Sequence, residues 1–466
     1  RRAPVVSLYC IGKCCYLHRR QDDTPQGPYL SSVAFYDTVC AEMRHDRTSR
    51  APAISLSDIY PDTAAARRRV NDLIAQHQDD FDPAEIALFS APGRTELGGN
   101  HTDHNNGSVL ASAVQLDALA AVSPRSDMTI RLTSRGFDQM FVVDLSDLQP
   151  KPEETGTSSA LIRGVAAGVA GADGSVGGFD ASVDSRVLPG SGLSSSASFE
   201  ILVATILNVL YNDGGLSSVT LSKISQAAEN DYFGKPCGLM DQIACSTGGI
   251  VAIDFEDLAE PVIRGLDFSF REHGMELLVV DTGGNHADLT PDYAAVPAEM
   301  RSVAGFFGRE TLRGVTVDEV LAAASDLREK TGDRAVLRAL HFLNENRRVD
   351  EMVAALSAGD LERYLDVVTA SGDSSWELLQ NCYTTQEPAH QGITTALALT
   401  RQFLVREGLT GTCRVHGGGF AGTIQAYVPI DAVAAYTRYI QEVFGPRAVT
   451  PLTVRSVGAT PISDGT

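Results

Sequence analysis

Apolar residues recur at helical spacing at the start of the main body of the chain, between residues 55 and 77. These positions are Ile59, Ala64, Ala65, Ala66, Val70, Leu73 and Ile74. Their spacing predicts a helix with one buried face, and Ser57 or Asp62 is a suitable N-cap. An apolar run at 86–90 then predicts a strand, which ends in a segment of short polar side chains.

The pattern continues with short strands and longer helices along the whole chain. Further strands are predicted at residues 109–116, 118–122, 128–132, 140–143, 181–187, 250–253, 277–280, 413–415 and 422–428. Helices are predicted over residues 156–172, 199–211, 222–232 and 239–245, and for about a hundred residues beyond 292. This order predicts an α+β fold with a domain junction near residues 265–285.

Length and charge narrow the functional classes. A chain of 466 residues is long enough for two or three domains. Its net charge of −21 argues against a nucleic-acid partner, because the footprint of a nucleic-acid groove is basic. A phosphate-bearing ligand must therefore be held by local donors or by a metal. No run of about 18 apolar residues is present, so no membrane span is expected.

The first 50 residues differ from the rest of the chain. They contain eight Lys and Arg against five acidic residues and show no helical or strand period, so we predict a disordered or non-native extension. Half of the eight cysteines also fall there, and the others are scattered without CxxC pairs. This distribution predicts a reduced, cytoplasmic protein.

Residues 91–110, APGRTELGGNHTDHNNGSVL, follow the strand predicted at 86–90. Glycine allows close approach of backbone to a ligand, while Asn, Asp and His provide donors and acceptors in several directions. The segment therefore favours a hydroxyl-rich ligand, with an ordinary Asn- and Gly-rich turn as the alternative.

Residues 188–198, LPGSGLSSSAS, lie between a predicted strand and a predicted helix. Backbone N–H groups at a helix N-terminus bind phosphate oxygens, and the helix dipole adds to that attraction. No Gly-Lys-Ser/Thr follows, so the segment is not a Walker loop. A flexible linker is the alternative, but the immediate passage into a helix argues against it.

Two further segments carry candidate chemistry. In residues 229–241, ENDYFGKPCGLMD, Asp241 is able to accept a proton from an attacking hydroxyl and Glu229 to reach Mg²⁺. Asp241 is alternatively a helix cap. Residues 415–422, VHGGGFAG, place three glycines between two strands, which suits either a nucleotide phosphate or a tight turn.

The order of these four motifs resembles the GHMP small-molecule kinases and, within them, the galactokinase family, over residues 85–455. The resemblance implies a two-domain GHMP kinase fold with an N-terminal domain at 51–275 and a C-terminal domain at 276–466. It places the active site in the cleft between the domains. It also implies ATP and Mg²⁺ as cofactors and a small-molecule sugar as partner, in a monomer or weak homo-oligomer.

Residue roles follow from the same resemblance. Asp241 would be the catalytic base, or the group that orients the sugar O1 hydroxyl, and Arg94 would steady that hydroxyl and the transferred phosphoryl group. The implied sugar contacts are Glu96, Asn100, His101, Asp103, Gly238 and Tyr293. The implied ATP contacts are Pro189, Gly190, Ser191, Gly192, Leu193, Ser194, Ser195, Ser196, Gly418 and Gly419. Ser196 and Glu229 would contact the magnesium ion.

The sugar motif departs from the galactokinase pattern at Glu96, Gly98, Asn100 and His104. The family has a glutamate at the position of Asn100 that contacts the C6 hydroxyl of the sugar. An amide there removes an ionised acceptor and lowers repulsion toward an anionic C6 group. Galactose is the expected substrate, with galacturonate, N-acetylgalactosamine or arabinose as alternatives. A non-catalytic sugar and nucleotide sensor is the alternative outside catalysis.

Overall fold

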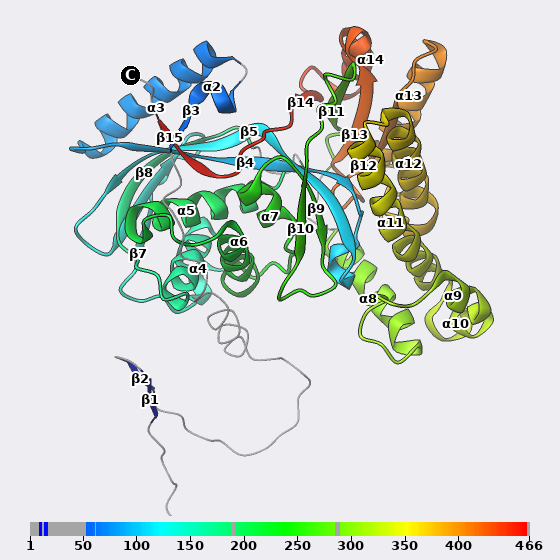
Figure 1. Cartoon of the computed structure of the whole chain (residues 1–466), viewed down its shortest axis with the longest axis horizontal. Helices are drawn as coiled ribbons and strands as arrows, with labels where there is room; N and C mark the ends of the chain where they lie inside the picture. The colour runs from blue at the N-terminus through cyan, green and yellow to red at the C-terminus, as the bar shows by residue number, and fades with distance from the viewer. Residues whose placement is uncertain are drawn as a thin grey trace, which may run out of the picture.

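The computed structural model describes residues 53–60, 62–187, 192–284 and 289–463, together with two short strands near the N-terminus. These strands, β1 (Tyr9–Ile11) and β2 (Cys14–Tyr16), pair antiparallel. The rest of the predicted extension at 1–50 lies outside the described residues. The α+β class is confirmed, because the described chain combines two main sheets with helices that cover them (Figure 1).

The larger sheet has nine strands, seven of them in the order β3-β15-β4-β5-β8-β6-β7; β9 also pairs with β5, and β10 pairs with β9. Its strands are β3 (Ile54–Ser55), β4 (Ala87–Gly98), β5 (Ser108–Pro124), β6 (Thr129–Ser134), β7 (Phe141–Asp144), β8 (Phe179–Ser185), β9 (Ile250–Asp254), β10 (Val262–Leu266) and β15 (Thr460–Ser463). The separate strands predicted at 109–116 and 118–122 are wrong. They form the single strand β5, which stays paired with β4 on both sides of a register shift between Pro92 and Arg94.

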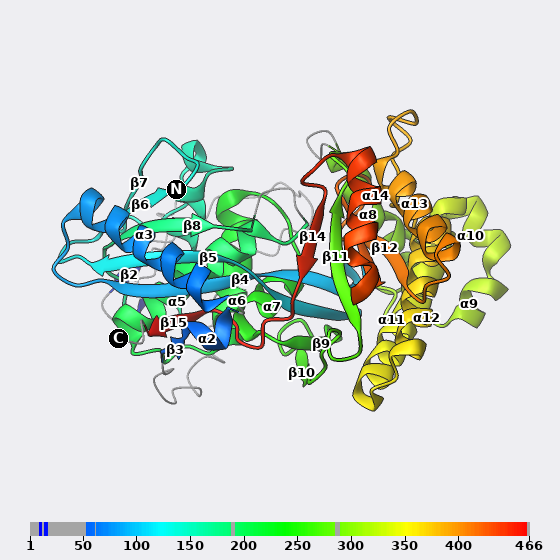
Figure 2. The same ribbon diagram turned by 90° about the horizontal axis from the view of Figure 1, so that it is seen from above.

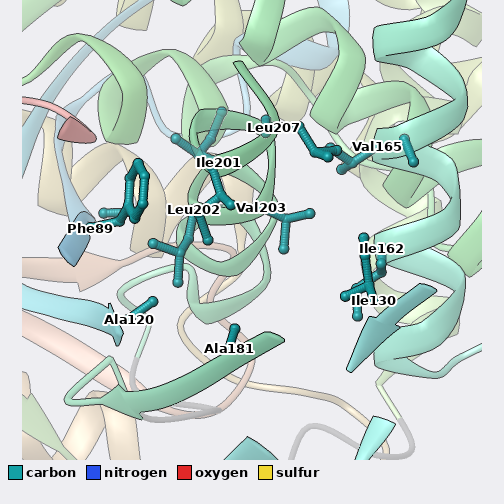
Figure 3. Close-up of a cluster of buried hydrophobic side chains, with 14 of the residues drawn as sticks. Phe89, Ala120, Ile130, Ile162, Val165, Ala181, Ile201, Leu202, Val203 and Leu207 are labelled. Carbon is teal, nitrogen blue, oxygen red and sulfur yellow. The ribbon is translucent and has the colours of Figure 1, made fainter. Parts of the chain in front are cut away.

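Helices cover both faces of this sheet, as Figure 1 shows. The helices are α2 (Leu56–Ile59), α3 (Thr63–Phe81), α4 (Ser158–Gly171), α5 (Ser195–Asn212), α6 (Ser218–Ala227) and α7 (Met240–Thr247), and a π-helical segment, Ala228–Phe233, follows α6. The predicted cap Asp62 is confirmed, since its side chain accepts a hydrogen bond from Ala65 N. Helix α5 lies at the centre of the core, where Ile201, Leu202 and Leu207 pack with side chains of the sheet and α4 (Figure 3).

The smaller sheet has the order β12-β13-β11-β14 and is entirely antiparallel. Its strands are β11 (Met275–Asp281), β12 (Thr412–His416), β13 (Thr423–Pro429) and β14 (Val449–Leu452). Its helices are α8 (Thr290–Phe306), α9 (Val317–Ala322), α10 (Ala324–Thr331), α11 (Asp333–Ala358), α12 (Leu361–Ser374), α13 (Gly392–Arg406) and α14 (Val433–Phe444). The long helical region predicted beyond residue 292 is therefore confirmed.

The two sheets are linked by two chain crossings. One runs from β10 to β11, within the junction predicted at 265–285, and the other runs from β14 to β15. The strand β15 thus belongs to the larger sheet, although it lies in the predicted C-terminal domain at 276–466. Figure 2 shows β11 and β14 between the larger sheet and the C-terminal helices. A buried cluster that joins Leu97 and Leu110 to Leu277 and Met352 holds the two parts together.

Candidate active site

Arg94 and Asp241 form a two-point ion pair. Arg94 lies on β4 and Asp241 in the first turn of α7. The guanidinium Nε lies 2.7 Å from Asp241 Oδ1, and Nη2 lies 2.9 Å from Oδ2. An aspartate near a helix start is often a cap, but the hydrogen bonds of this carboxylate come from Arg94 and from the Ser194 hydroxyl. The pair joins two of the predicted motifs at one point.

The charge state of Asp241 follows from these partners. Burial alone would raise the pKa of the carboxyl group, but the charge of Arg94 and the hydrogen bonds from Arg94 and Ser194 outweigh it. The pKa is therefore held below its ordinary value, and Asp241 is ionised at neutral pH. An ionised carboxylate can accept a hydrogen bond from a hydroxyl group and orient it.

The described part of the predicted phosphate loop is hydrogen-bonded to Arg94. Leu188 to Ser191, and with them the predicted contacts Pro189, Gly190 and Ser191, lie outside the described residues. In the described part, Arg94 N donates to Leu193 O at 3.1 Å and Arg94 Nη1 donates to Gly192 O at 2.5 Å. The loop is thereby tied to β4 through both the backbone and the side chain of one arginine.

The loop ends where α5 begins. Ser194 has a φ of 58°, in the left-handed region, and α5 starts at the next residue without a side-chain cap. Its first N–H groups are therefore left to other partners, at the positive end of the helix dipole. Because Ser194, Ser195 and Ser196 line a cavity, this helix start is suited to an anionic ligand.

That cavity has a volume of about 220 Å³ and lies between the loop and the C-terminal glycine motif. It is lined by Arg94, Gly192, Ser194, Ser195, Ser196, Lys235, Asp241, His416, Gly417, Gly418, Gly419, Ala421 and Thr423. Gly192 has a φ of 73°, and a Cβ there would lie 2.6 Å from Thr423 Oγ1 and 2.8 Å from His416 Nδ1. Only glycine fits this contact, through which motifs more than 200 residues apart form one pocket.

Ser196 and Glu229, the predicted magnesium contacts, lie side by side. Ser196 Oγ donates to Glu229 Oε1 at 2.9 Å, and Lys235 Nζ donates to the same oxygen at 3.0 Å. Gln242 Nε2 donates to the other carboxylate oxygen at 3.1 Å. A hydroxyl and a carboxylate are hard oxygen donors of the kind that Mg²⁺ prefers, so the two residues fit this ion.

Four predicted sugar contacts are linked to the same region. A Cβ on Gly238 would lie 1.9 Å from Asp103 Oδ2, so the Asp103 carboxylate lies directly against the backbone of Gly238. His101 Nε2 lies 2.8 Å from Gly418 O, and the Tyr293 hydroxyl donates to Gly419 O at 2.7 Å.

Burial lowers the pKa of His101 to about 3, so its ring is neutral at neutral pH. A carbonyl oxygen can only accept, so Nε2 of His101 carries the hydrogen that binds Gly418 O. The other ring nitrogen, Nδ1, is then an acceptor, as a sugar hydroxyl requires.

Asn100 lies elsewhere, in a polar network inside the protein. The side chain is fully buried, and its Nδ2 donates to Glu96 Oε1 at 3.1 Å and to Gly417 O at 2.7 Å. Its Oδ1 accepts from Asn381 Nδ2 at 2.7 Å. This arrangement speaks against the predicted sugar contact of Asn100, because its amide is already engaged by protein groups.

Glu96 is part of the same network. Its side chain is buried and forms an ion pair with Arg414 at 2.6 Å. Burial raises the pKa of Glu96 to about 7, although Arg414 and Arg94 act in the opposite direction. The carboxyl group thus bridges β4 and β12 and does not point away from the protein as a free acceptor.

Five residues that line the cavity were not among the predicted site residues. They lie within or next to quoted motifs and are Lys235, His416, Gly417, Ala421 and Thr423. His416 is buried and binds the hydroxyls of Thr95 and Thr423 through its two ring nitrogens. A signal was present for Lys235, because it is a cation between Gly234 and Gly238 in a motif with an acidic residue at each end.

Comparisons with known proteins agree with this geometry. The model of the galactokinase galactose-binding signature matches residues 75–124, and that of the GHMP kinase N-terminal domain matches residues 160–249. The galactokinase of Streptomyces coelicolor is 35% identical over 363 residues, which cover 77% of this chain and 88% of that protein. The chain belongs to the galactokinase family.

Solved structures show the same fold as this galactokinase family member. Lactococcus lactis galactokinase in complex with galactose superposes with a TM-score of 0.72 at 24% identity, over 84% of this chain and 99% of that one. Methanococcus jannaschii mevalonate kinase superposes with a TM-score of 0.57 at 14% identity, over 80% and 99%. The GHMP kinase fold predicted from the motifs is therefore confirmed.

Proposed function

We propose that this protein transfers the terminal phosphoryl group of ATP to the C1 hydroxyl of galactose. The observation that carries the proposal is the Arg94–Asp241 pair, which lies against a cavity that the phosphate loop and the C-terminal glycine motif share. An ionised acceptor and a cation lie together beside a helix N-terminus suited to phosphate. Phosphoryl transfer depends mostly on such positioning and charge neutralisation.

Asp241 acts on the sugar hydroxyl in this proposal. Its carboxylate accepts the hydrogen bond of O1–H and takes the proton as O1 bonds to the terminal phosphorus and the bond from phosphorus to ADP oxygen breaks. The lowered pKa of Asp241 suits an orienting acceptor, since little proton transfer is needed in a loose transition state. Arg94 fixes the carboxylate from one side and places positive charge next to the transferred group.

The phosphate end is built from the loop and two oxygen ligands. The start of α5 and its serines would bind nucleotide phosphates, and Ser196 with Glu229 would hold Mg²⁺. Mg²⁺, when bound, neutralises phosphate charge in such transfers. Ser196 must then turn its hydroxyl hydrogen away from Glu229, so that both oxygens face the ion.

The sugar end is assigned to His101, Asp103, Gly238 and Tyr293. These residues provide a neutral ring acceptor, a carboxylate, a closely approached backbone and a phenol. Galactose is favoured over a sugar with an anionic C6 group, because the amide of Asn100 is engaged inside the protein.

In the chain that the structure describes, no helix is both long and apolar enough to span a bilayer, and four cysteines are free thiols. A cytoplasmic monomer or weak homo-oligomer remains part of the proposal.

The test is a panel of aldoses and uronic acids with MgATP, using the wild type and Asp241→Asn. Galactose should give the highest rate, and Asp241→Asn should lower kcat by 10²–10⁴-fold, the usual range for a lost proton acceptor. Asp138→Asn, in the exposed turn between β6 and β7, is the matched control and should keep full activity. Sugar binding without any phosphorylated product would favour the sensor, and unaltered activity of Asp241→Asn would exclude this role for Asp241.

A further inference from the structure

Lys235 lies at the edge of the cavity and shares a ligand with the proposed metal site. It follows the π-helical segment and donates from Nζ to Glu229 Oε1 at 3.0 Å. Ser196 Oγ donates to that same oxygen at 2.9 Å. The carboxylate of Glu229 is buried, while the side chain of Lys235 is 62% exposed. The lysine is therefore anchored at its tip and has room to move along its stem.

The charge around Glu229 explains why a cation is held there. Gln242 Nε2 binds both Glu229 at 3.1 Å and a second buried carboxyl group, Glu200, at 3.2 Å. Glu200 Oε1 has no hydrogen-bond partner in the described part of the chain. Glu229 is the buried carboxylate with an ion-pair partner, and burying a carboxylate without a cation is costly. Lys235 supplies the positive charge beside Glu229.

A magnesium ion and an ammonium group compete for Glu229 Oε1. Two cations at one carboxylate oxygen repel each other, so the lysine must leave that oxygen when the ion binds. A flexible four-carbon stem with an exposed side chain permits this movement. The cavity that Lys235 lines also contains Arg94, Asp241 and the serines at the start of α5, where the transferred phosphoryl group would lie.

We propose that Lys235 occupies the place of the metal ion in the free protein and moves onto the nucleotide phosphates when metal and nucleotide bind. In the free protein it keeps Glu229 in position. In the complex it adds a second side-chain cation, besides Arg94, to a centre where negative charge develops. The inference rests on the proposed function, because it takes the cavity to be a nucleoside triphosphate site.

Binding experiments without turnover test both halves of the inference. Titration calorimetry with Mn²⁺ alone should show tighter binding to Lys235→Met than to the wild type, by about fivefold or more, because the competing cation is gone. A non-hydrolysable ATP analogue with saturating Mg²⁺ should bind Lys235→Met at least tenfold more weakly. Lys235→Arg should recover much of the nucleotide affinity. Lys223→Met, which removes a half-buried lysine that binds Ala259 O, is the matched control.

Each outcome decides a part of the inference. Unchanged Mn²⁺ affinity in Lys235→Met overturns the competition, and unchanged nucleotide affinity overturns the phosphate contact. Neither measurement needs a sugar or a product. If the wild type phosphorylates no sugar but these two affinities shift as expected, the proposed function fails and the role of Lys235 at the nucleotide stands.

Discussion

Replacement of Asn100 by aspartate tests whether this residue holds the protein together or contacts the substrate. The two side chains have the same shape, so the change removes the Nδ2 donor and adds a charge. The donor serves Glu96 Oε1 at 3.1 Å and Gly417 O at 2.7 Å. In the variant, one carboxylate oxygen would face another carboxylate and a carbonyl oxygen inside the protein.

The magnitude follows from these contacts. Two lost hydrogen bonds account for about 2 kcal/mol. Two charges 3.1 Å apart repel by about 5 kcal/mol at an effective dielectric constant of 20, but Glu96, with a pKa of about 7, can instead retain a proton for about 1 kcal/mol at pH 7.5. Asn100→Asp should therefore lower the free energy of unfolding by about 3 kcal/mol at pH 7.5. At pH 5 the loss should be about 2 kcal/mol, because Glu96 has a pKa of about 7 and is then protonated.

Urea unfolding at pH 7.5 and pH 5 measures this difference. Asn100→Asp combined with Glu96→Gln should lose about 2 kcal/mol at both pH values, since the neutral glutamine can donate to the new carboxylate and does not titrate. Asn106→Asp is a control within the same motif, because its amide makes only a 3.3 Å bond to Glu256 O at the surface. A loss below about 1 kcal/mol at both pH values, with altered sugar preference, would refute the reasoning and place Asn100 at the sugar.

Two other substitutions address the sugar site and the buried His416. Gly238→Ala should raise the KM for sugar at least tenfold with little change for ATP, because the new methyl group would lie 1.9 Å from Asp103 Oδ2; steady-state kinetics would check this. Gly265→Ala has open space around it and should change neither constant, and equal effects of the two variants would contradict the contact. Burial lowers the pKa of His416 to about 3, so its contribution to stability is present above pH 6.5 and is lost as the pH falls toward 3. Between pH 7.5 and pH 5.5 the free energy of unfolding of the wild type should fall by about 1.4 kcal/mol more than that of His416→Gln, as measured by urea unfolding. If the two proteins differ by the same free energy at both pH values, His416 titrates normally.

The sequence was most informative where local chemistry decides the structure. Asp62 is an N-cap because its side chain accepts a hydrogen bond from the backbone N–H of Ala65. The neighbouring residues alone are enough to predict this contact. The order of the motifs predicts one site for Arg94 and Asp241, and the structure brings the two side chains together through packing of α7 against β4.

Long-range partners could not be predicted in the same way. Glu96 and Asn100 looked like substrate contacts because they replace residues of a known motif, whereas their partners Arg414 and Asn381 lie about 280 to 320 residues further along the chain. The strand β15 was missed for a similar reason. It has only four residues, and its place beside β4 is set by the fold rather than by its own pattern.

The return of the chain through β14 to β15 has a mechanical consequence. The crossings at β10–β11 and β14–β15 leave from neighbouring strands, since β11 pairs with β14. Arg455 in the second crossing is hydrogen-bonded to Ala113 and Gly249, which belong to the part of the chain with the larger sheet, here called the first lobe; the part with the smaller sheet is the second lobe. A single linker allows swinging and twisting in any direction, but two adjacent ones leave rotation about the line between them as the softest motion. We expect opening and closing of the cleft to follow this one axis, so that the lobes return to the same alignment after every cycle.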